Sequence, residues 1–276
     1  LGTRPDRADT DNDSISDLQE LRNRSNPLDN QPPGNGVIAT LETAGTAVDV
    51  AIRGPIALVA DRQAGVAVVD VADPFAPALI QQVNTPGDAT AVAIVNDLGV
   101  VADGAEGVTI LDLSAPATAS ILRQFKPGGD FRAIASSGQR VFAGSTAGTV
   151  VTFDLLSGTE ASRLQLPSNP RIEDLAVEGD VLYVWTVGNL HVLTLETGAP
   201  QYRRGVPTPV SNANDFRRTR LRLSPERAYG TYTDGVVVFD RTDPWNTIVL
   251  ATRATAQLGW KDLVPVAPRL AMPADG

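Results

Sequence analysis

Short apolar runs separated by turn residues extend through most of the chain, from about residue 37 to its end. In one clear stretch the runs cover residues 48–52, 56–60, 66–71 and 79–83, with Gly, Asp or Pro in the segments between them. Short runs rich in Val, Ile, Leu and Ala, bounded in this way, are typical of β-strands joined by tight turns. The pattern predicts an all-β domain over residues 37–276.

The set of four runs recurs about five times between residues 47 and 255. The third run ends at an aligned position in each unit, and these positions are 42, 42, 40 and 46 residues apart. A near-constant period indicates a repeat architecture, and four antiparallel strands per unit arranged radially form a β-propeller blade. The first strand of a blade lines the axis, where small residues fit. The aligned residues are Asp70, Asp112, Asp154, Thr194 and Asp240 in the third run and Ala51, Ala93, Ala135 and Ala176 in the first.

The two ends of this domain predict how the propeller closes. Residues 37–43 match a fourth strand, and residues 262–264 and 270–276 match the first two strands of a sixth unit. We therefore expect about six four-stranded blades, with strands from both ends in one blade. Because that blade lacks a third strand, we expect the propeller to be cut at Gly276.

Residues 1–36 are polar, rich in Asp and Asn, and end in a Pro/Gly linker at residues 31–36. Residues 9–20 have the spacing of a twelve-residue calcium loop, which supplies oxygen ligands to a hard cation. Carboxylates occupy loop positions 1, 3, 5, 9 and 12, position 7 contributes its backbone carbonyl, and residues 18–22 look helical. The predicted Ca²⁺ ligands are Asp9, Asp11, Asp13, Ile15, Asp17 and Glu20.

Ser14 stands where the loop prefers a Gly with positive φ, so we expect a weakened site. The alternative is that this segment is a solvated linker. The flanks favour calcium, because Thr3-Arg4-Pro5 is echoed after the loop by a second motif that ends at Pro27. With the run of acidic residues between them, these motifs resemble thrombospondin type 3-like calcium repeats of bacterial surface proteins. The resemblance covers residues 1–30 and implies that the chain starts within an array of such repeats.

The stretches at residues 59–74 and 101–113 share Val-Ala-Asp, a short turn ending in Gly, and an apolar run that contains an Asp. They resemble the LVIVD repeat, as do residues 234–244, whereas the third and fourth units lack its Asp-Pro turn. The resemblance implies a β-propeller in a large extracytoplasmic bacterial or archaeal protein, mostly without an assigned activity.

Composition excludes several classes of protein and site. The net charge is -9 and the only lysines are Lys126 and Lys261, so nothing indicates a nucleic-acid partner. The chain has no cysteine, which excludes disulfides, thiolate nucleophiles and Cys-ligated zinc. No apolar run approaches the length of a membrane span, and no signal peptide is in view.

Two sets of aspartates are candidates for a site in the propeller. The first, Asp49, Asp174 and Asp262, stands at the ends of inner strands and could serve a hydrolase or lyase. Convergence of these three would favour chemistry, whereas an axis lined by Ala and Val would favour a binding module. The second set recurs at the ends of second strands and could form a cation site, but we favour a role in satisfying the backbone of their turns. These residues are Asp61, Asp103 and Asp275.

Other notable side chains have a structural and a functional interpretation. His191 lies in an apolar run and is expected to be structural. An insertion at about residues 210–219 carries neighbouring arginines, which either bind an anionic glycan or acidic partner or belong to a solvated loop and polar outer strand; we favour the second. We expect the tryptophans to pack between blades. The residues are Arg203, Arg204, Arg217, Arg218, Arg220 and Arg222, and Trp185, Trp245 and Trp260.

Together these patterns favour a non-enzymatic module of a larger bacterial protein that is secreted or lies at the cell surface. We expect it to bind Ca²⁺ and to have a structural, adhesive or interaction role with an unknown protein or glycan partner. The alternatives are a propeller enzyme that uses axial carboxylates and a purely architectural spacer.

Overall fold

The computed structural model describes residues 3–4, 6–11, 16–23, 27–28, 39–196, 198–210, 219–233, 235–254, 262–266 and 269–271. The chain divides into two compact units, Leu1–Thr40 with Pro74–Ala76, and Leu41–Asp73 with Pro77–Gly276. The described part of the first unit contains one helix, α1 (Asp17–Asn23). The described part of the second unit is built almost entirely of β-strands, which confirms the all-β prediction.

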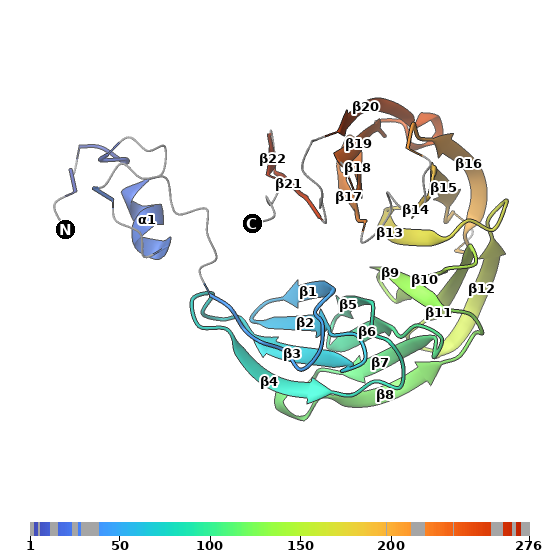
Figure 1. Ribbon diagram of the computed structural model, residues 1–276, viewed down its shortest axis with the longest axis horizontal. Helices are drawn as coiled ribbons and strands as arrows, with labels where there is room; N and C mark the ends of the chain where they lie inside the picture. The colour runs from blue at the N-terminus through green and yellow to red at the C-terminus, as the bar shows by residue number, and fades with distance from the viewer. Residues whose placement is uncertain are drawn as a thin grey trace. The chain divides into compact units, whose positions relative to one another are not determined.

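The second unit is a β-propeller. Its described strands form five four-stranded antiparallel sheets and a two-stranded sheet (Figure 1). Each four-stranded sheet is one blade, in which consecutive strands pair from the axis outward. The first strands of neighbouring blades contact one another, so these strands line the axis as predicted.

The first three blades span residues 49–165 and follow the predicted runs closely. A short 3-10 helix, η1 (Pro116–Thr118), leads to the outer strand of the second blade. The strands are β1 (Asp49–Arg53), β2 (Ile56–Ala60), β3 (Val66–Asp70) and β4 (Ala78–Val83), then β5 (Ala91–Val95), β6 (Leu98–Ala102), β7 (Val108–Asp112) and β8 (Ser120–Phe125), then β9 (Phe131–Ser137), β10 (Arg140–Ser145), β11 (Thr149–Asp154) and β12 (Thr159–Gln165).

The fourth and fifth blades repeat the arrangement, and the two-stranded sheet follows them. The 3-10 helix η3 (Pro244–Asn246) corresponds in position to η1. The strands are β13 (Ile172–Glu178), β14 (Val181–Thr186), β15 (Asn189–Thr194) and β16 (Gln201–Pro207), then β17 (Leu221–Ser224), β18 (Arg227–Tyr232), β19 (Gly235–Asp240) and β20 (Ile248–Ala254), then β21 (Val264–Val266) and β22 (Arg269–Ala271).

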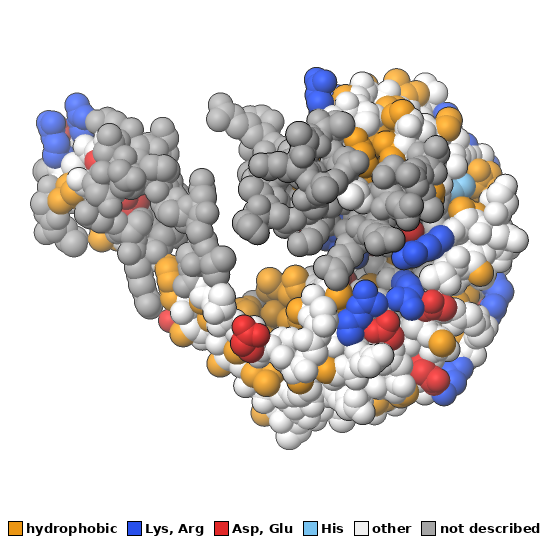
Figure 2. Space-filling view, viewed as in Figure 1, with side chains coloured by type: hydrophobic (Ala, Val, Ile, Leu, Met, Phe, Trp, Pro, Cys, Tyr) orange, Lys and Arg blue, Asp and Glu red, His pale blue; other side chains and the backbone are white. Residues whose placement is uncertain are grey.

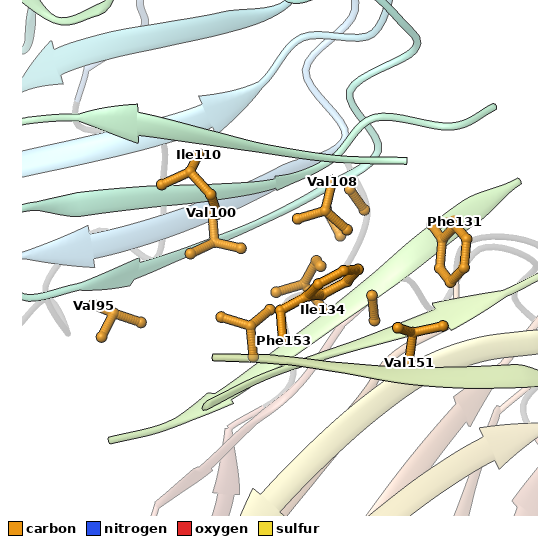
Figure 3. Close-up of a cluster of buried hydrophobic side chains, with 12 residues drawn as sticks. Val95, Val100, Val108, Ile110, Phe131, Ile134, Val151 and Phe153 are labelled. Carbon is orange, nitrogen blue, oxygen red and sulfur yellow. The ribbon is translucent and has the colours of Figure 1, made fainter. Parts of the chain in front are cut away.

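The hydrophobic core lies in the spaces between neighbouring blades. Between the second and third blades, Val100 and Ile110 face Ile134, Val151 and Phe153 (Figure 3). Similar clusters fill the spaces between the first and second, third and fourth, and fourth and fifth blades. Because neighbours cover both faces of a blade, the second and third strands are buried at most positions, which explains their continuous apolar runs.

One predicted strand is wrong in its described part. Residues 39–43, part of the expected fourth strand at residues 37–43, are not in a strand; residues 37 and 38 lie outside the described residues. This segment instead leads into the first blade. Thr43 and Gly45 donate hydrogen bonds to Asp61, so their polar groups are satisfied by a side chain and not by a strand ladder.

Candidate functional site

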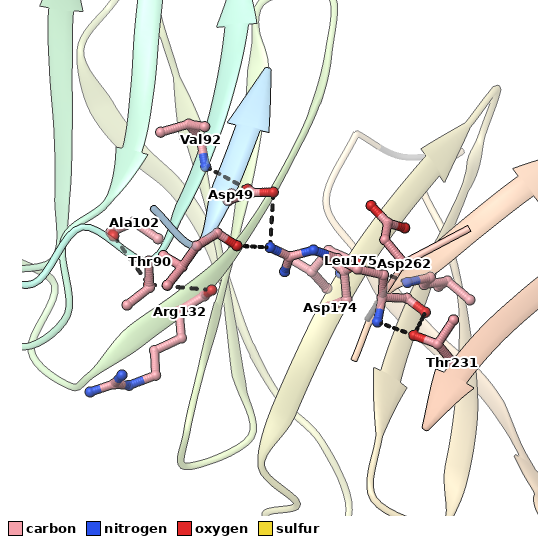
Figure 4. A network of polar contacts seen from close by, with 12 residues as sticks. Asp49, Thr90, Val92, Ala102, Arg132, Asp174, Leu175, Thr231 and Asp262 are labelled. Carbon is pink, nitrogen blue, oxygen red and sulfur yellow. Dashed lines mark hydrogen bonds and ion pairs between the residues drawn. The ribbon is translucent and has the colours of Figure 1, made fainter. Parts of the chain in front are cut away.

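Charged residues from several blades form a network at the propeller axis, here called the axial network (Asp49, Asp174, Arg220, Arg222 and Asp262). Asp49 begins β1, Asp174 lies in β13, and Asp262 stands two residues before β21. Arg220 directly precedes β17, and Arg222 lies within it. The three predicted aspartates therefore do approach one another, but arginines lie between them (Figure 4).

The two arginines connect the three carboxylates. Arg220 Nη2 lies 2.9 Å from Asp49 Oδ1 and also donates to the backbone carbonyl of Val48, at 2.8 Å. Arg222 Nη2 lies 2.5 Å from Asp262 Oδ2, and its Nη1 lies 3.5 Å from Asp174 Oδ2. Ion pairs with the fifth blade thus reach the first blade, the fourth blade and the segment before β21.

Two of the aspartates also join the inner strands of adjacent blades. The backbone N–H of Val92, in the second blade, donates to Asp49 Oδ2 at 2.9 Å. In the same way the N–H of Leu221, in the fifth blade, donates to Asp174 Oδ2 at 2.7 Å. These carboxylates satisfy backbone groups that would otherwise be buried without a partner.

Burial and neighbouring charges shift the pKa values of Asp174 and Arg220 in opposite directions. Burial raises the pKa of Asp174, and the positive charges of Arg220 and Arg222 offset part of that rise. Burial lowers the pKa of Arg220, but the charges of Asp174, Asp49 and Asp262 together raise it overall. Arg220 therefore remains positively charged, and the two arginines compensate most of the charge of the three carboxylates.

A cavity of about 260 Å³ lies beside the axial network and shares Arg220 with it. Each of the five four-stranded blades contributes a lining residue, either from a strand or from the segment next to one. Four of the lining residues are arginines and one is a carboxylic acid, and Figure 2 shows basic and acidic side chains gathered near the inner ends of the blades. We call it the arginine cavity, and its polar lining comprises Arg62, Thr90, Arg132, Arg171, Glu173, Thr219 and Arg220.

Glu173 is the acid of the arginine cavity. Its side chain is only 5% exposed, and one of its carboxylate oxygens lies 3.1 Å from Arg171 Nε. Burial raises its pKa to about 7, although Arg171 and Arg132 partly oppose the rise and Asp174 adds to it. Glu173 therefore changes its charge near neutral pH, which is unusual for a carboxylic acid.

Sequence reasoning did not predict the arginine cavity. Arg132 and Asp174 occupy the aligned first position of the inner strand, where Asp49 also stands. Charge at that position of an otherwise apolar run was the available signal. Periodicity could not reveal that side chains from five different units meet, because their approach depends on how the blades are arranged around the axis.

The buried Asp103 has a structural role, but not the predicted one of bonding to the backbone of its own hairpin turn. Its carboxylate accepts hydrogen bonds from Thr85 Oγ1 at 2.7 Å, from the N–H of Gly87 at 3.2 Å and from Thr109 Oγ1 at 2.9 Å. It therefore ties the segment entering the second blade to the β6–β7 turn. The related Asp275 lies outside the described residues.

Asp61 has the corresponding role in the first blade. Thr43 Oγ1 and the N–H of Gly45 donate to it at 2.7 and 2.8 Å. In both blades the donors belong to a Thr-x-Gly sequence that precedes the aspartate by 18 and 16 residues. This recurring spacing between the Thr-x-Gly sequence and the aspartate was a signal in the sequence that the two are in contact.

His191 and Trp185 lie in the interior of the fourth blade. His191 Nε2 is 3.1 Å from Thr186 Oγ1, and burial lowers its pKa to about 4, so the imidazole is neutral at pH 7. Trp185 is fully buried between the fourth and fifth blades and donates through Nε1 to the carbonyl of Thr231 at 3.3 Å. These contacts agree with the structural roles expected for both residues.

Trp245 contacts the neighbouring blade as expected, but it does so from the protein surface and is not buried in the core. It lies in η3, is 43% exposed, and has the guanidinium of Arg203 5.8 Å from its ring centroid. Arg203 and Arg204 belong to β16 of the fourth blade, and Arg204 Nη1 donates to the carbonyl of Trp245 at 3.3 Å, so Trp245 joins outer parts of the fourth and fifth blades. Trp260 lies outside the described residues.

The favoured interpretation of the arginines near residues 210–219 is also wrong in part. Arg220 and Arg222 belong to the axial network and not to a solvated loop or an outer strand. Because β17 is an inner strand, side chains at its start reach the axis. Arg203 and Arg204 do lie on the outer strand β16, whereas Arg217 and Arg218 lie outside the described residues.

The predicted calcium loop lies in the first unit and is described in part. Asp9, Asp11, Asp17 and Glu20 are described, and Asp13 and Ile15 lie outside the described residues. Helix α1 begins at Asp17, whose carboxylate accepts hydrogen bonds from the N–H and the hydroxyl of Thr10, both at 2.7 Å. The side chain of Glu20 is buried. Within the described part of the chain, no group of three or more His, Cys, Asp or Glu residues is placed to hold a metal ion.

Comparison with protein families identifies the repeat in the first two blades. Residues 44–85 and 86–125 match the LVIVD repeat. These LVIVD repeats coincide with the first and second blades, where the sequence resemblance was clearest. No curated protein matches the chain.

Solved structures with similar folds support the propeller. A protein from Lactobacillus plantarum has a TM-score of 0.66 and 16% identity, with 82% of this chain and 76% of that one covered. The computationally designed Ika8 protein has a TM-score of 0.64 and 16% identity, with coverage of 81% and 66%. BamB from Moraxella catarrhalis has a TM-score of 0.56 and 18% identity, with coverage of 77% and 63%. The chain spans slightly less than two thirds of the Ika8 and BamB chains, and the likeness concerns the fold.

The described helices give no candidate for a membrane span, because none is both long and apolar enough.

Proposed function

We propose that the chain is a calcium-binding interaction module of a larger extracellular or cell-surface bacterial protein. In this proposal the propeller is a rigid scaffold that presents its loops to a protein or glycan partner. The N-terminal segment is a connector that calcium orders. The propeller fold and its LVIVD repeats support the scaffold role, since binding residues are commonly carried by loops that a rigid framework holds in place.

The observation that carries the calcium part is the position of α1. The helix begins at Asp17, which is loop position 9, and Glu20 at position 12 lies on its first turn with a buried side chain. A twelve-residue calcium loop leads into a helix that carries a Glu at its last position, so a helix that starts within the loop and carries a buried Glu there supports the proposal. Asp9, Asp11, Asp13, Asp17 and Glu20 would supply carboxylate oxygens and Ile15 its backbone carbonyl. A bound Ca²⁺ would stabilise this segment by coupling binding to folding.

The axial network supports a structural role for the propeller axis over the alternative of a hydrolase or lyase. Asp49, Asp174 and Asp262 each pair with an arginine, and two of them also accept backbone hydrogen bonds from the next blade. A general base needs a lone pair directed at the substrate. Carboxylates that join blades are better suited to holding the scaffold together.

Calorimetric titration of Ca²⁺ into the chain tests the proposal. We expect saturable binding that is lost in the Asp9→Ala/Asp13→Ala variant. The matched control is Asp6→Ala, which removes a carboxylate just outside the loop that pairs with Arg4 at the surface. Because calcium orders the segment, proteolysis between residues 5 and 25 should slow on addition of Ca²⁺ in the wild type and in the control only.

Absence of binding at millimolar calcium would refute the calcium part of the proposal. Equal binding by the Asp9→Ala/Asp13→Ala variant would place the ion elsewhere. Either result would leave the propeller scaffold as a separate question, since the second unit contributes none of the predicted ligands.

A further inference from the structure

We propose that the arginine cavity is a binding site for a small organic anion that carries carboxylate or phosphate groups. The site lies within the propeller and does not depend on the N-terminal calcium loop. Its elements are a cavity of about 260 Å³, guanidinium groups contributed by four blades, and a single acidic lining residue. Calcium binding and anion binding can therefore succeed or fail independently.

The arginines of the cavity are held in place but keep donors for a ligand. Arg62 Nη1 pairs with Asp88 at 3.0 Å, and Arg171 Nε pairs with Glu173 at 3.1 Å. A guanidinium group has five N–H donors, so one ion pair leaves others available. Contacts of this kind reduce the side-chain entropy that a ligand must otherwise overcome. The planar, forked donors match the oxygens of a carboxylate or phosphate.

The distribution of charge makes the cavity wall positive. Asp88 pairs with both Arg62 and Arg132, Asp130 also pairs with Arg132, and Asp49 pairs with Arg220. None of these three aspartates lines the cavity, so the cavity surface itself carries the arginines. The lining carries four guanidinium groups and one carboxyl group, so its charge is positive whether or not Glu173 is ionised. An anion is therefore attracted into the cavity although the whole chain is acidic.

The size of the cavity limits the ligand. A volume of about 260 Å³ is just below the range of roughly 300–1,000 Å³ that is typical of sites for drug-sized ligands. Thr90 and Thr219 add hydroxyl groups to the lining, and Val48 and Ile172 add apolar surface. The lining thus suits a compact anion with some hydroxyl or apolar carbon, such as a small di- or tricarboxylate or a phosphate ester.

Glu173 makes anion binding depend on pH. The charges that act on its carboxyl group are those of Arg171 and Asp174 from its own segment and Arg132 from β9. Arg220 lines the same cavity from the segment before β17. The pKa of Glu173 is raised to about 7, so it is negatively charged above that pH and repels an anion. Below that pH it is neutral and can donate a hydrogen bond to a ligand oxygen. The affinity for the anion should rise as the pH falls from about 8 to about 6. The expected increase is roughly tenfold, because one negative charge close to the ligand is removed.

Isothermal titration with citrate and with inorganic phosphate, at low ionic strength, tests the site. The Arg62→Gln/Arg171→Gln variant should bind either anion at least about tenfold more weakly, since two charge-assisted contacts are lost. Arg163→Gln is the matched control, because Arg163 forms an ion pair with Glu160 on the outer strand β12, outside the cavity. Glucose serves as a neutral probe that should not bind. Thermal melts of each variant without ligand establish that it folds.

A second variant makes the pH dependence specific. Glu173→Gln removes the charge and keeps the size of the side chain. For malate, a dicarboxylate that stays almost fully ionised from pH 6 to pH 8, the affinity of this variant at pH 8 should therefore match that of the wild type at pH 6. The control Glu160→Gln should retain the full pH dependence, because Glu160 lies outside the cavity.

Two results would overturn the proposal. The first is failure of both anions to bind the wild type at about 10 mM. The second is equal binding by the wild type and the Arg62→Gln/Arg171→Gln variant, which would assign any affinity to other surface arginines. If binding passes these tests but its pH dependence persists in Glu173→Gln, the assignment of that dependence to Glu173 is wrong.

Discussion

Single buried polar residues in this protein act mainly as connectors between segments. Asp61 and Asp103 each accept hydrogen bonds from the segment that enters their blade, and Asp49 and Asp174 accept them from the next blade. A buried carboxylate is unfavourable unless such partners are present. Substitution of any of these aspartates therefore measures how much its hydrogen bonds contribute to stability.

Asp103 offers the clearest test, because three donors meet its carboxylate. Substitution Asp103→Ala should lower the free energy of unfolding by about 2–4 kcal/mol, since these donors lose a buried acceptor. Urea denaturation measures the change. Asp97→Ala, which removes an exposed carboxylate paired with Arg53, should have little effect. A similar small loss in both variants would show that water replaces Asp103 at no cost.

His191 predicts a dependence of stability on pH. Burial lowers its pKa to about 4 in the folded protein, whereas an unfolded chain has a value near 6.5. Between these values the unfolded chain binds a proton that the folded protein does not. The free energy of unfolding should therefore decrease as the pH is lowered through this range. From pH 7 to pH 5, His191 alone should account for a loss of about 2 kcal/mol.

The comparison between wild type and His191→Gln isolates this effect from that of Glu173, whose raised pKa acts in the opposite direction. Denaturation at pH 7 and pH 5 should show a smaller loss of stability in the variant than in the wild type. Equal losses in the two proteins would mean that the imidazole is accessible to protons in the folded state.

At the scale of elements, strands could be predicted well and their connections less well. Every blade has a bulge between its third and fourth strands, at Val68/Val69 in the first blade and Ile110/Leu111 in the second. Such bulges increase the local twist of a sheet. Apolar runs do not reveal them, since one extra residue in an exposed outer strand changes neither composition nor period. The segment at residues 39–43 was misassigned because its composition suits a strand. The structure instead uses its last residue, Thr43, and the nearby Gly45 to donate hydrogen bonds to Asp61.

The turn between β6 and β7 gives a prediction at this scale. Gly107 has φ +91, and a Cβ there would lie 2.1 Å from the carbonyl oxygen of Phe125. Gly138 has φ +57 but has no heavy atom within 4 Å of such a Cβ. Gly138→Ala should therefore lose only the conformational term, about 1–2 kcal/mol, and Gly107→Ala should lose more because the backbone must also move.

Chemical denaturation of the two alanine variants measures this difference. We expect Gly107→Ala to lower the free energy of unfolding clearly more than Gly138→Ala does. Equal losses would mean that the end of the outer strand β8 at Phe125 relaxes freely and that the close approach has no energetic consequence.

For the whole molecule, the sequence predicted the number of complete repeats but not the chemistry at their centre. The period near 42 residues predicted blades whose first strands line the axis, and the three axial aspartates followed from that arrangement. The arginines between them did not, because Arg220 and Arg222 belong to the one unit with irregular spacing. Spacing places a residue on a strand, whereas ion pairs between blades depend on how all the blades are tilted around the axis.

The contact between Arg220 and Asp49 allows the contribution of the axis to be measured. It joins the fifth blade to the first, residues 171 positions apart in the chain, and both side chains are largely buried at 15% and 16% exposure. Removing one partner leaves the other charge buried without compensation, so Arg220→Gln should cost about 3–5 kcal/mol. The Asp49→Asn/Arg220→Gln double variant should be less destabilised than the sum of the two single variants.

Hydrogen exchange shows where the axial network acts. If the ion pair fixes the first blade to the fifth, Arg220→Gln should increase exchange of amide protons in β1 and in the neighbouring segment at Val92, whose N–H donates to Asp49. Strands β10 and β11 of the third blade should be unchanged, because their hydrogen bonds and core do not involve the pair. Uniformly increased exchange would indicate that loss of Arg220 lowers global stability alone. Increased exchange confined to β17 would indicate that Arg220 acts within its own blade and that the first blade is held by its other contacts.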